Sequence, residues 1–387
     1  MKKTRISRLV IILGILGGIS LAVVKLYVDS QEKKYQFYQE VNIRGVLNLN
    51  DLQCFTDLRA MKLTKEKSKK INLENKYDVL LTCTFDTLTP WPSKDRMPAN
   101  FNPGEIINIG MDPGLSIREL HRQGITGKDV KVAIIDFPFL PNHEEYRDKV
   151  VLFNLTNGKS MKTLRKPAMH GTGTASLLVG ERCGVAPGAK LYFWGNPDPG
   201  AKDFTQDING FQEILKFNSN KKPADCIRVV SLSFGAAKDF KKVDAFEKII
   251  EKLRDTGVTV VIVDKWINGI GCPLYKDRNN PLDYRLQYYF QGYEKDIPSD
   301  VLYIPCDNRT TASERGEKEY TFHGEGGLSW AVPYLAGVIA LGYQVDPNLK
   351  TKVIFKYLRD TGTPYNRGWI INPRKFIQAI KQNLKVI

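Results

Sequence analysis

Short apolar segments alternate with segments of helical length from residue 115 onward, and this alternation restricts the fold more than any other feature. The first of them, VKVAIID at 130–136, is a continuous run typical of a strand buried on both faces. Strands are also expected at 190–194, 228–233 and 258–263, and helices at 170–180, 204–217, 243–254, 329–343 and 350–358. This order predicts an α/β fold, a doubly wound parallel sheet with helices on both faces. Site residues of such folds gather at the carboxyl ends of the strands.

The composition is that of a globular protein. Of the 387 residues, 42% are hydrophobic and 26% are charged, which excludes a disordered or fibrous chain. Six cysteines are too few for a disulfide scaffold. The net charge of +15 fits an anionic cell envelope or acidic substrates, or serves solubility alone. The basic residues are dispersed and form no nucleic-acid-binding motif, so we expect no nucleic acid partner.

The N-terminus has the pattern of a membrane signal. Basic residues precede an apolar run at 9–28 that is interrupted only by Lys25. A spanning helix needs about 20 residues, and the stem of a lysine near its end can reach the interface. The basic flank predicts the N-terminus inside and the C-terminal domain outside the cell membrane. We expect residues 1–28 to form a basic tail and a single-pass transmembrane anchor; a cleaved signal of a secreted protein and a buried core helix are the alternatives.

The segment at 29–114 is less defined by its sequence. Residues 77–85 (YDVLLTCTF) predict a buried strand. The prolines and asparagines of 89–102 predict an extended linker without regular elements. This stalk or N-terminal extension is an inhibitory pro-segment, a subdomain near the stalk, or an extension wrapped on the main domain, which residues 115–387 form.

Three residues with complementary chemistry stand at the ends of predicted elements. Asp136 ends the first strand, His170 opens a helix in HGTGTA, and Ser329 opens another in GLSWAVPYLAG. A serine hydroxyl needs a base to become a good nucleophile. Imidazole is such a base, and a buried carboxylate fixes its tautomer and stabilises the imidazolium. A helix N-terminus at Ser329 adds a backbone donor and a positive dipole for a developing oxyanion.

The order Asp–His–Ser and the motifs around it resemble the subtilisin-like serine peptidase family (subtilases). The resemblance spans about 115–375 and is carried by 132–136, 170–175, 184–191 (GVAPGAKL), 231–235 (SLSFG) and 327–337. It implies a doubly wound sheet of subtilisin type and peptide-bond hydrolysis through an acyl-enzyme, with Asp136, His170 and Ser329 as the triad. It also implies that Ser231, Ser233 and Gly235 bind the substrate backbone.

The chain departs from the family pattern around the triad. Leu328 and Trp330 flank the serine where Thr and Met are common, and Gly173 stands where a second His is usual. The family's oxyanion asparagine follows the strand that matches 258–263, where this chain reads DKWING. Asn268 is the candidate donor if the loop is longer by about two residues, and Lys265 is the alternative. Loss of such a donor costs about 10²–10³ in rate.

Metals and cofactors have no sequence signature here. The cysteines lack metal-ligand spacing, and no D-x-[DN]-x-[DN]-G calcium loop is present. We expect no cofactor, although subtilases also bind calcium through other loops. His121, His143 and His323 are interpreted as structural or surface residues, and Cys183 as a packed thiol.

Two functions therefore stay open. The first is a membrane-anchored serine endopeptidase that acts on protein or peptide substrates outside the membrane. The second is a catalytically weak or inactive protein of the subtilase fold that serves surface binding or scaffolding. The intact triad favours the first, and the altered loop at 264–269 favours the second.

Overall fold

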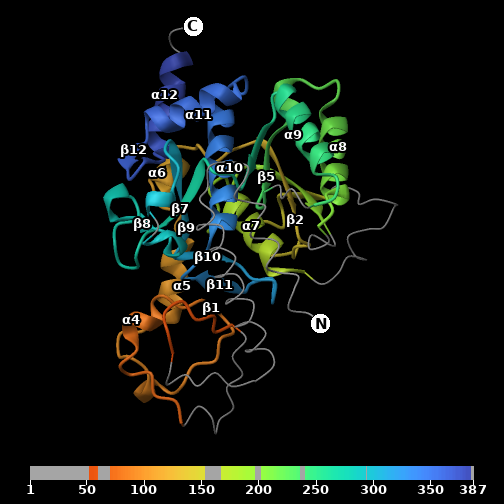
Figure 1. Cartoon of the computed structure of the whole chain (residues 1–387). Coiled ribbons are helices and arrows are strands. Elements are labelled where there is room, and N and C mark those ends of the chain that lie inside the picture. The colour runs from red at the N-terminus through yellow and green to blue at the C-terminus, as the bar shows by residue number, and fades with distance from the viewer. Residues whose placement is uncertain are drawn as a thin grey trace.

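The computed structural model describes residues 52–59, 70–152, 167–196, 202–235, 240–292 and 294–384. The predicted transmembrane anchor at 9–28 lies outside these residues. Two five-stranded sheets and one three-stranded sheet make up the strands of the described chain (Figure 1).

The first sheet is the parallel sheet that the sequence predicts. Its strands are β3 (Val150–Leu152), β4 (Lys190–Gly195), β2 (Lys131–Asp136), β5 (Ile227–Leu232) and β6 (Thr259–Ile262), in this spatial order. All neighbouring strands run parallel. The sheet extends from β2 to both sides, which is the doubly wound arrangement and puts a crevice at the carboxyl ends of the central strands.

Helices cover both faces of this sheet. On one face lie α7 (Met169–Val179) and α10 (Leu328–Val345), and on the other α8 (Thr205–Asn218) and α9 (Val243–Asp255) (Figure 1). Successive residues of β2 follow this division, because Ile134 packs in the core with α7 and α10 while Ile135 packs with α8 and α9. The alternation explains why the strand is apolar throughout.

A second sheet continues beside the first and was not predicted as such. Its order is β12 (Thr363–Tyr365), β13 (Gly368–Ile370), β9 (Val301–Asp307), β7 (Ile267–Gly271) and β8 (Arg285–Leu286). Strand β9 runs parallel to both β7 and β13, whereas β8 and β12 are antiparallel edges. Helix α10 contacts both large sheets and joins them through one hydrophobic core.

The remaining helices lie outside these layers. They are α6 (Ile117–Arg122), α11 (Thr351–Asp360) and α12 (Pro373–Leu384), with short 3-10 turns at Lys94–Arg96, Pro223–Asp225, Pro281–Asp283, Tyr288–Phe290 and Glu294–Asp296. Among the described residues, only α10 is long and apolar enough to cross a membrane, and 78% of it is buried inside the protein. It is the central core helix of the domain.

The described part of the N-terminal extension, residues 52–59 and 70–111, packs on the main domain. Strand β1 (Phe85–Asp86) pairs with β11 (Tyr320–His323), which also pairs with β10 (Arg309–Ala312). Helix α5 (Pro103–Met111) lies against β10 and β11, and the extension shares an apolar core with them. This part of the molecule lies at the end opposite α11 and α12 (Figure 1).

The strand predicted at 77–85 is wrong. Residues 77–80 form one turn of helix, α4 (Tyr77–Leu80), and of the predicted segment only Thr84, in an isolated bridge with Asp57, and Phe85, in β1, pair as strand residues. A short apolar run does not distinguish a strand from a helical turn by periodicity, and here only Leu80 of the turn is buried. Residues 89–102 contain one 3-10 turn and no other regular element, close to the expected linker.

Candidate active site

Asp136 and His170 meet at the carboxyl end of β2. The Nδ1 atom of His170 lies 2.6 Å from Oδ1 of Asp136, which is buried. The same carboxylate accepts hydrogen bonds from the Phe137 amide at 2.7 Å and from the Thr174 hydroxyl at 3.0 Å. These donors fix the carboxylate, so that its bond to Nδ1 leaves Nε2 of His170 available as a base.

The carboxylate also sets the basicity of the histidine. Burial by itself lowers the pKa of His170, but the charge of Asp136 and its hydrogen bond outweigh burial and hold the pKa above its ordinary value. This is the electrostatic arrangement that stabilises an imidazolium once a proton has been accepted.

Ser329 lies in the first turn of α10, beside the end of β5. Its hydroxyl points to the carbonyl oxygen of Ser233 at 3.4 Å, and the Ser233 hydroxyl donates to the Ser329 carbonyl at 2.9 Å. Gly327, with φ at 76°, precedes the helix in the left-handed region that favours glycine. The serine is therefore presented at a helix N-terminus, next to the carboxyl edge of the first sheet.

Trp330 connects the serine helix to the histidine helix. Its ring lies 5.5 Å from the His170 ring between centroids, and 5.1 Å from the ring of His323. A Cβ atom at Gly173 would come within 2.8 Å of the indole, so α7 and α10 pack together only because residue 173 has no side chain. The two departures from the family pattern at 173 and 330 are complementary in size.

No hydrogen bond joins His170 to Ser329 in the described part of the chain. The two residues begin neighbouring helices, and their connection is the indole of Trp330. Catalytic hydrogen bonds in unliganded sites are commonly long and shorten when substrate binds.

Residues 127–263 match the family model described as the subtilase family. The sequence of this segment is therefore similar to that family. The segment includes Asp136, His170 and 231–235, whereas Asn268 and Ser329 follow it.

Solved structures with a related arrangement have low sequence identity. The chain covers 99% of a chain of the subtilase cytotoxin SubAB with 74% of its own length, at 16% identity and a TM-score of 0.48. It covers 98% of the prenylagaramide maturation protease PagA with 68% of its own length, at 16% identity and a TM-score of 0.46. It covers 88% of a cold-adapted subtilisin-like serine proteinase with 64% of its own length, at 17% identity and a TM-score of 0.46. No curated protein matches the chain in sequence.

The loop after β6, where the resemblance places the oxyanion donor, is held by its own hydrogen bonds. The carboxylate of Asp264 accepts hydrogen bonds from the Lys265 amide at 2.6 Å and from Nε1 of Trp266 at 3.0 Å. Asn268 lies inside β7, opposite Tyr303, and its side-chain oxygen accepts from the Gly269 amide at 2.7 Å. Asn268 is buried, and no hydrogen bond connects it to Ser329 among the described residues. Its role as the oxyanion donor of this subtilase-like site stays a prediction.

The predicted substrate-binding segment divides into an inner and an outer part. Ser231 lies within β5, in register with Ile134 on one side and Val261 on the other. Its hydroxyl is buried and has no hydrogen-bond partner in the described part of the chain. Ser233, which is buried, and Gly235, which is partly exposed, follow the end of the strand, and the binding of a substrate backbone by this segment stays a prediction.

Two buried carboxylates near the subtilase-like pair are absent from the sequence prediction. Asp207, in the first turn of α8, accepts from the Asn196 amide group at 3.1 Å, and burial together with the charge of Asp136 raises its pKa to about 6. Asp307 ends β9 and binds the chain just before Ser329. Asp307 ends an apolar run, as Asp136 does. That signal was available in the sequence.

The other histidines pack as structural residues. His121 bonds the Val185 carbonyl at 2.8 Å, His143 the Glu319 carbonyl at 2.8 Å, and His323 the Thr311 hydroxyl at 3.1 Å. The six cysteines are all free, and burial holds the pKa of the Cys183 thiol well above its ordinary value. No group of His, Cys, Asp or Glu side chains suited to a metal ion occurs in the described residues.

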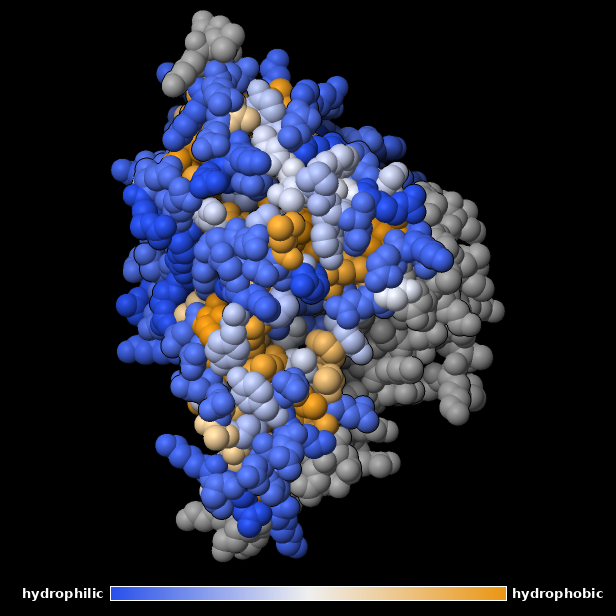
Figure 2. Space-filling view, turned by 90° about the vertical axis from the view of Figure 1, so that its left-hand side faces the viewer, coloured by the Kyte–Doolittle hydropathy of each residue, from blue (hydrophilic) through white to orange (hydrophobic). Residues whose placement is uncertain are grey.

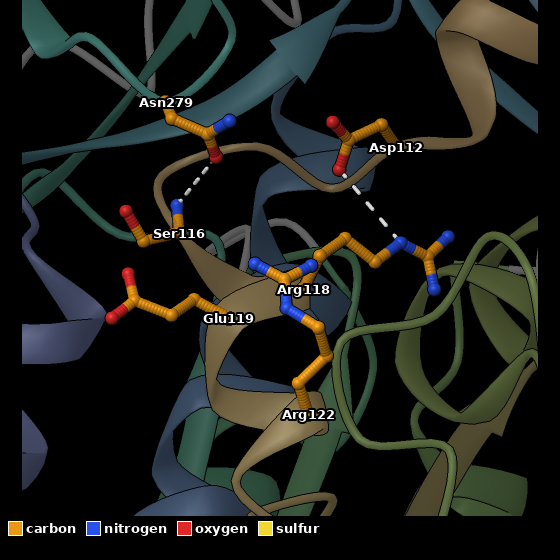
Figure 3. A pocket seen from close by; sticks show the side chains of 6 residues that line it. All are labelled: Asp112, Ser116, Arg118, Glu119, Arg122 and Asn279. Atoms are coloured by element: carbon orange, nitrogen blue, oxygen red, sulfur yellow. Dashed lines mark hydrogen bonds and ion pairs between the residues drawn. The ribbon is translucent and has the colours of Figure 1, made fainter.

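A polar cavity of about 360 Å³ lies apart from the triad residues. It is lined by Asp112, Ser116, Arg118, Glu119, Arg122 and Asn279. In Figure 3, Arg118 reaches toward Asp112, and the Ser116 amide points to the side chain of Asn279. The face that carries α4 and β8 is mainly hydrophilic, with separate apolar areas (Figure 2). Isolated apolar areas of this kind are ordinary on protein surfaces.

Proposed function

We propose that the chain is a serine endopeptidase that hydrolyses protein or peptide substrates with Asp136, His170 and Ser329. The observation that carries the proposal is the 2.6 Å bond between Asp136 and Nδ1 of His170, on a helix that packs against the helix whose first turn holds Ser329. A buried carboxylate that fixes a histidine tautomer next to a serine is the arrangement of an activated nucleophile. The subtilase match over 127–263 supports a serine-peptidase type of chemistry.

The chemistry follows from these groups. Nε2 of His170 takes the proton of the Ser329 hydroxyl as Oγ attacks the peptide carbonyl carbon. The C–N bond then breaks, Nε2 gives its proton to the leaving amine, and the acyl group stays on Oγ. Water, deprotonated by the same nitrogen, hydrolyses the ester and restores the hydroxyl. The backbone N–H of Ser329 and the side chain of Asn268 are the proposed donors to the oxyanion.

Labelling of the full-length chain with a fluorophosphonate probe tests this proposal. We expect the wild-type protein to be labelled, and Ser329→Ala and His170→Ala to lose labelling. Ser219→Ala, an exposed serine at the end of α8, is the matched control and should label as the wild type does. A folded wild-type protein that takes no label contradicts the proposal.

We further propose that residues 9–28 anchor the protein in the cell membrane with the peptidase domain outside. The basic residues before this apolar run and its length support the assignment. Deletion of residues 1–28 should move the protein from the membrane fraction to the soluble fraction. A wild-type chain shortened at its N-terminus would instead indicate a cleaved signal.

The alternative function is a scaffold of the subtilase fold with weak or no activity. The loop at 264–269 favours it, because Asp264 binds its own loop and the Asn268 oxygen binds the next amide. A folded protein without labelling, whose binding to a surface partner survives Ser329→Ala, would support this second function.

A further inference from the structure

Asp307 binds the chain immediately before the candidate nucleophile. Its Oδ1 atom accepts hydrogen bonds from the amides of Gly326 at 2.8 Å and Gly327 at 3.4 Å. Its Oδ2 atom accepts from the amide of Tyr288 at 3.1 Å. The side chain is buried, so these bonds replace water around a carboxylate and strongly fix the two segments that supply the amides. One carboxylate thus ties residues 326–327 to residue 288.

The N-terminal extension reaches both of these segments. The ring of Phe55 stacks on the ring of Tyr288, with centroids 3.7 Å apart. The Phe55 amide donates to the Thr82 hydroxyl at 2.9 Å. Thr82 in turn lies against Gly324, where a side chain would clash with its backbone carbonyl. The extension therefore contacts the chain before Ser329 directly at Gly324 and indirectly through Tyr288 and Asp307.

We propose that the N-terminal extension braces the loop at 324–328 for catalysis, and that Asp307 is the positioning residue that links this brace to Ser329. The inference rests on the proposed peptidase function and deepens it, because it assigns an activating role to a segment whose sequence left its role open. Asp307 touches no reacting atom in this scheme. It acts through the backbone that leads into α10.

The brace is tested by removing its contact in the extension. Phe55→Ala loses the ring pair with Tyr288. Phe217→Ala on α8, which loses the ring pair with Tyr192 on β4, is the matched control. An aromatic pair contributes enough to change the population of a held loop by about 2- to 10-fold. We expect Phe55→Ala to slow fluorophosphonate labelling of Ser329 by this factor, with Phe217→Ala unchanged.

Hydrogen exchange of the peptide around 324–329 provides a readout that does not depend on activity. The Gly326 amide should exchange faster in Phe55→Ala and faster still in Asp307→Ala, while peptides from β2 and β5 keep their protection. Asp307→Asn keeps one acceptor oxygen and should fall between the wild type and Asp307→Ala in both exchange and labelling, which also serves if Asp307→Ala does not fold.

The outcomes separate the two proposals. Unchanged exchange at Gly326 in Phe55→Ala overturns the brace whether or not the protein is labelled. Faster exchange with wild-type labelling rates overturns the catalytic role of the brace. Faster exchange in Phe55→Ala, combined with a wild-type protein that is never labelled at Ser329, overturns the peptidase proposal and with it the positioning role of Asp307.

Discussion

At the scale of single residues, two buried aspartates near the candidate site differ in the donors around them. Asp136 accepts from an amide, a hydroxyl and the imidazole of His170. Asp207 has the Asn196 side chain as its neighbouring donor, and burial raises its pKa to about 6. The carboxylate of Asp136 thus has three donors, whereas burial disfavours the charged form of Asp207, which has few donors.

Replacement of Asp136 should therefore change both the rate and its pH dependence. In Asp136→Asn the causes that raise the pKa of His170 vanish, and the lowering effect of burial remains. The neutral base then persists to lower pH, so the acidic limb of the labelling rate should move to lower pH. The rate itself should fall by on the order of 10⁴, since the imidazolium loses its counter-charge and its tautomer. Labelling rates from pH 5 to 9, with the exposed Asp148→Asn as control, check both effects.

Replacement of Asp207 should stabilise the fold at neutral pH. Its pKa of about 6 in the folded protein lies above the ordinary 3.8, so ionisation of the folded state costs stability as pH rises between these values. Asp207→Asn removes that cost and keeps the oxygen that binds Asn196. We expect a gain of up to about 3 kcal/mol at pH 7 and little gain at pH 4. Urea unfolding of the wild type and Asp207→Asn at both pH values measures this gain. Equal free energies of unfolding for the two proteins at pH 7 would contradict the expectation.

At the scale of elements, the contact between α7 and α10 depends on a small residue at position 173 facing a large one at position 330. Gly173 leaves the space that the Trp330 indole occupies, and the same indole lies on the ring of His170. The resemblance to subtilases implies a histidine at position 173 and a methionine at position 330. The serine helix and the histidine helix are thus matched as a pair, and each position constrains the other.

A double-mutant cycle should reveal this coupling. Gly173→His alone overpacks the contact and should cost about 1–3 kcal/mol of unfolding free energy. Trp330→Met alone leaves a cavity and also destabilises. The double variant should lose less than the sum of the two, by at least about 1 kcal/mol. Additive losses in urea unfolding would show that the two helices do not share this contact.

At the scale of the whole molecule, the sequence predicted one sheet and missed its neighbour. Strands β2, β4, β5 and β6 are mainly apolar, so their residue types alone predict that they are buried. Strand β7 (INGIG) is interrupted by glycines and by Asn268, and its place is set by β9 and α10 rather than by its own pattern. The same limit applies to the site. Asp136, His170 and Ser329 stand in recognisable motifs, whereas the partners of Asp307 and Phe55 lie far along the chain and leave no local signal.

The attachment of the extension should depend on Gly324. Gly324→Ala sets a methyl group against the Thr82 carbonyl, so either β11 or the extension must shift. We expect Gly324→Ala to lower the free energy of unfolding by about 2 kcal/mol or more, which exceeds the effect of the same substitution at an ordinary surface glycine. Gly104→Ala, where a Cβ makes only an ordinary contact with the Asn102 side chain at 3.5 Å and the backbone is not in the left-handed region, is the control. Comparable losses in the two variants would mean that the extension is loosely held.

The pairing of β1 with β11 also determines when the extension can dock during synthesis of the chain. Arg315 binds the carboxylate of Asp86 across 229 residues of sequence, so the extension leaves the ribosome long before its partners exist. At about 5–20 residues per second, this interval is roughly 10–50 s. During that time Phe85 has its ring contacts with Trp91 and Phe101 of the extension but lacks the ring of Phe322 on β11. The face of the extension that packs on β11 therefore stays uncovered until residues 320–323 have been synthesised.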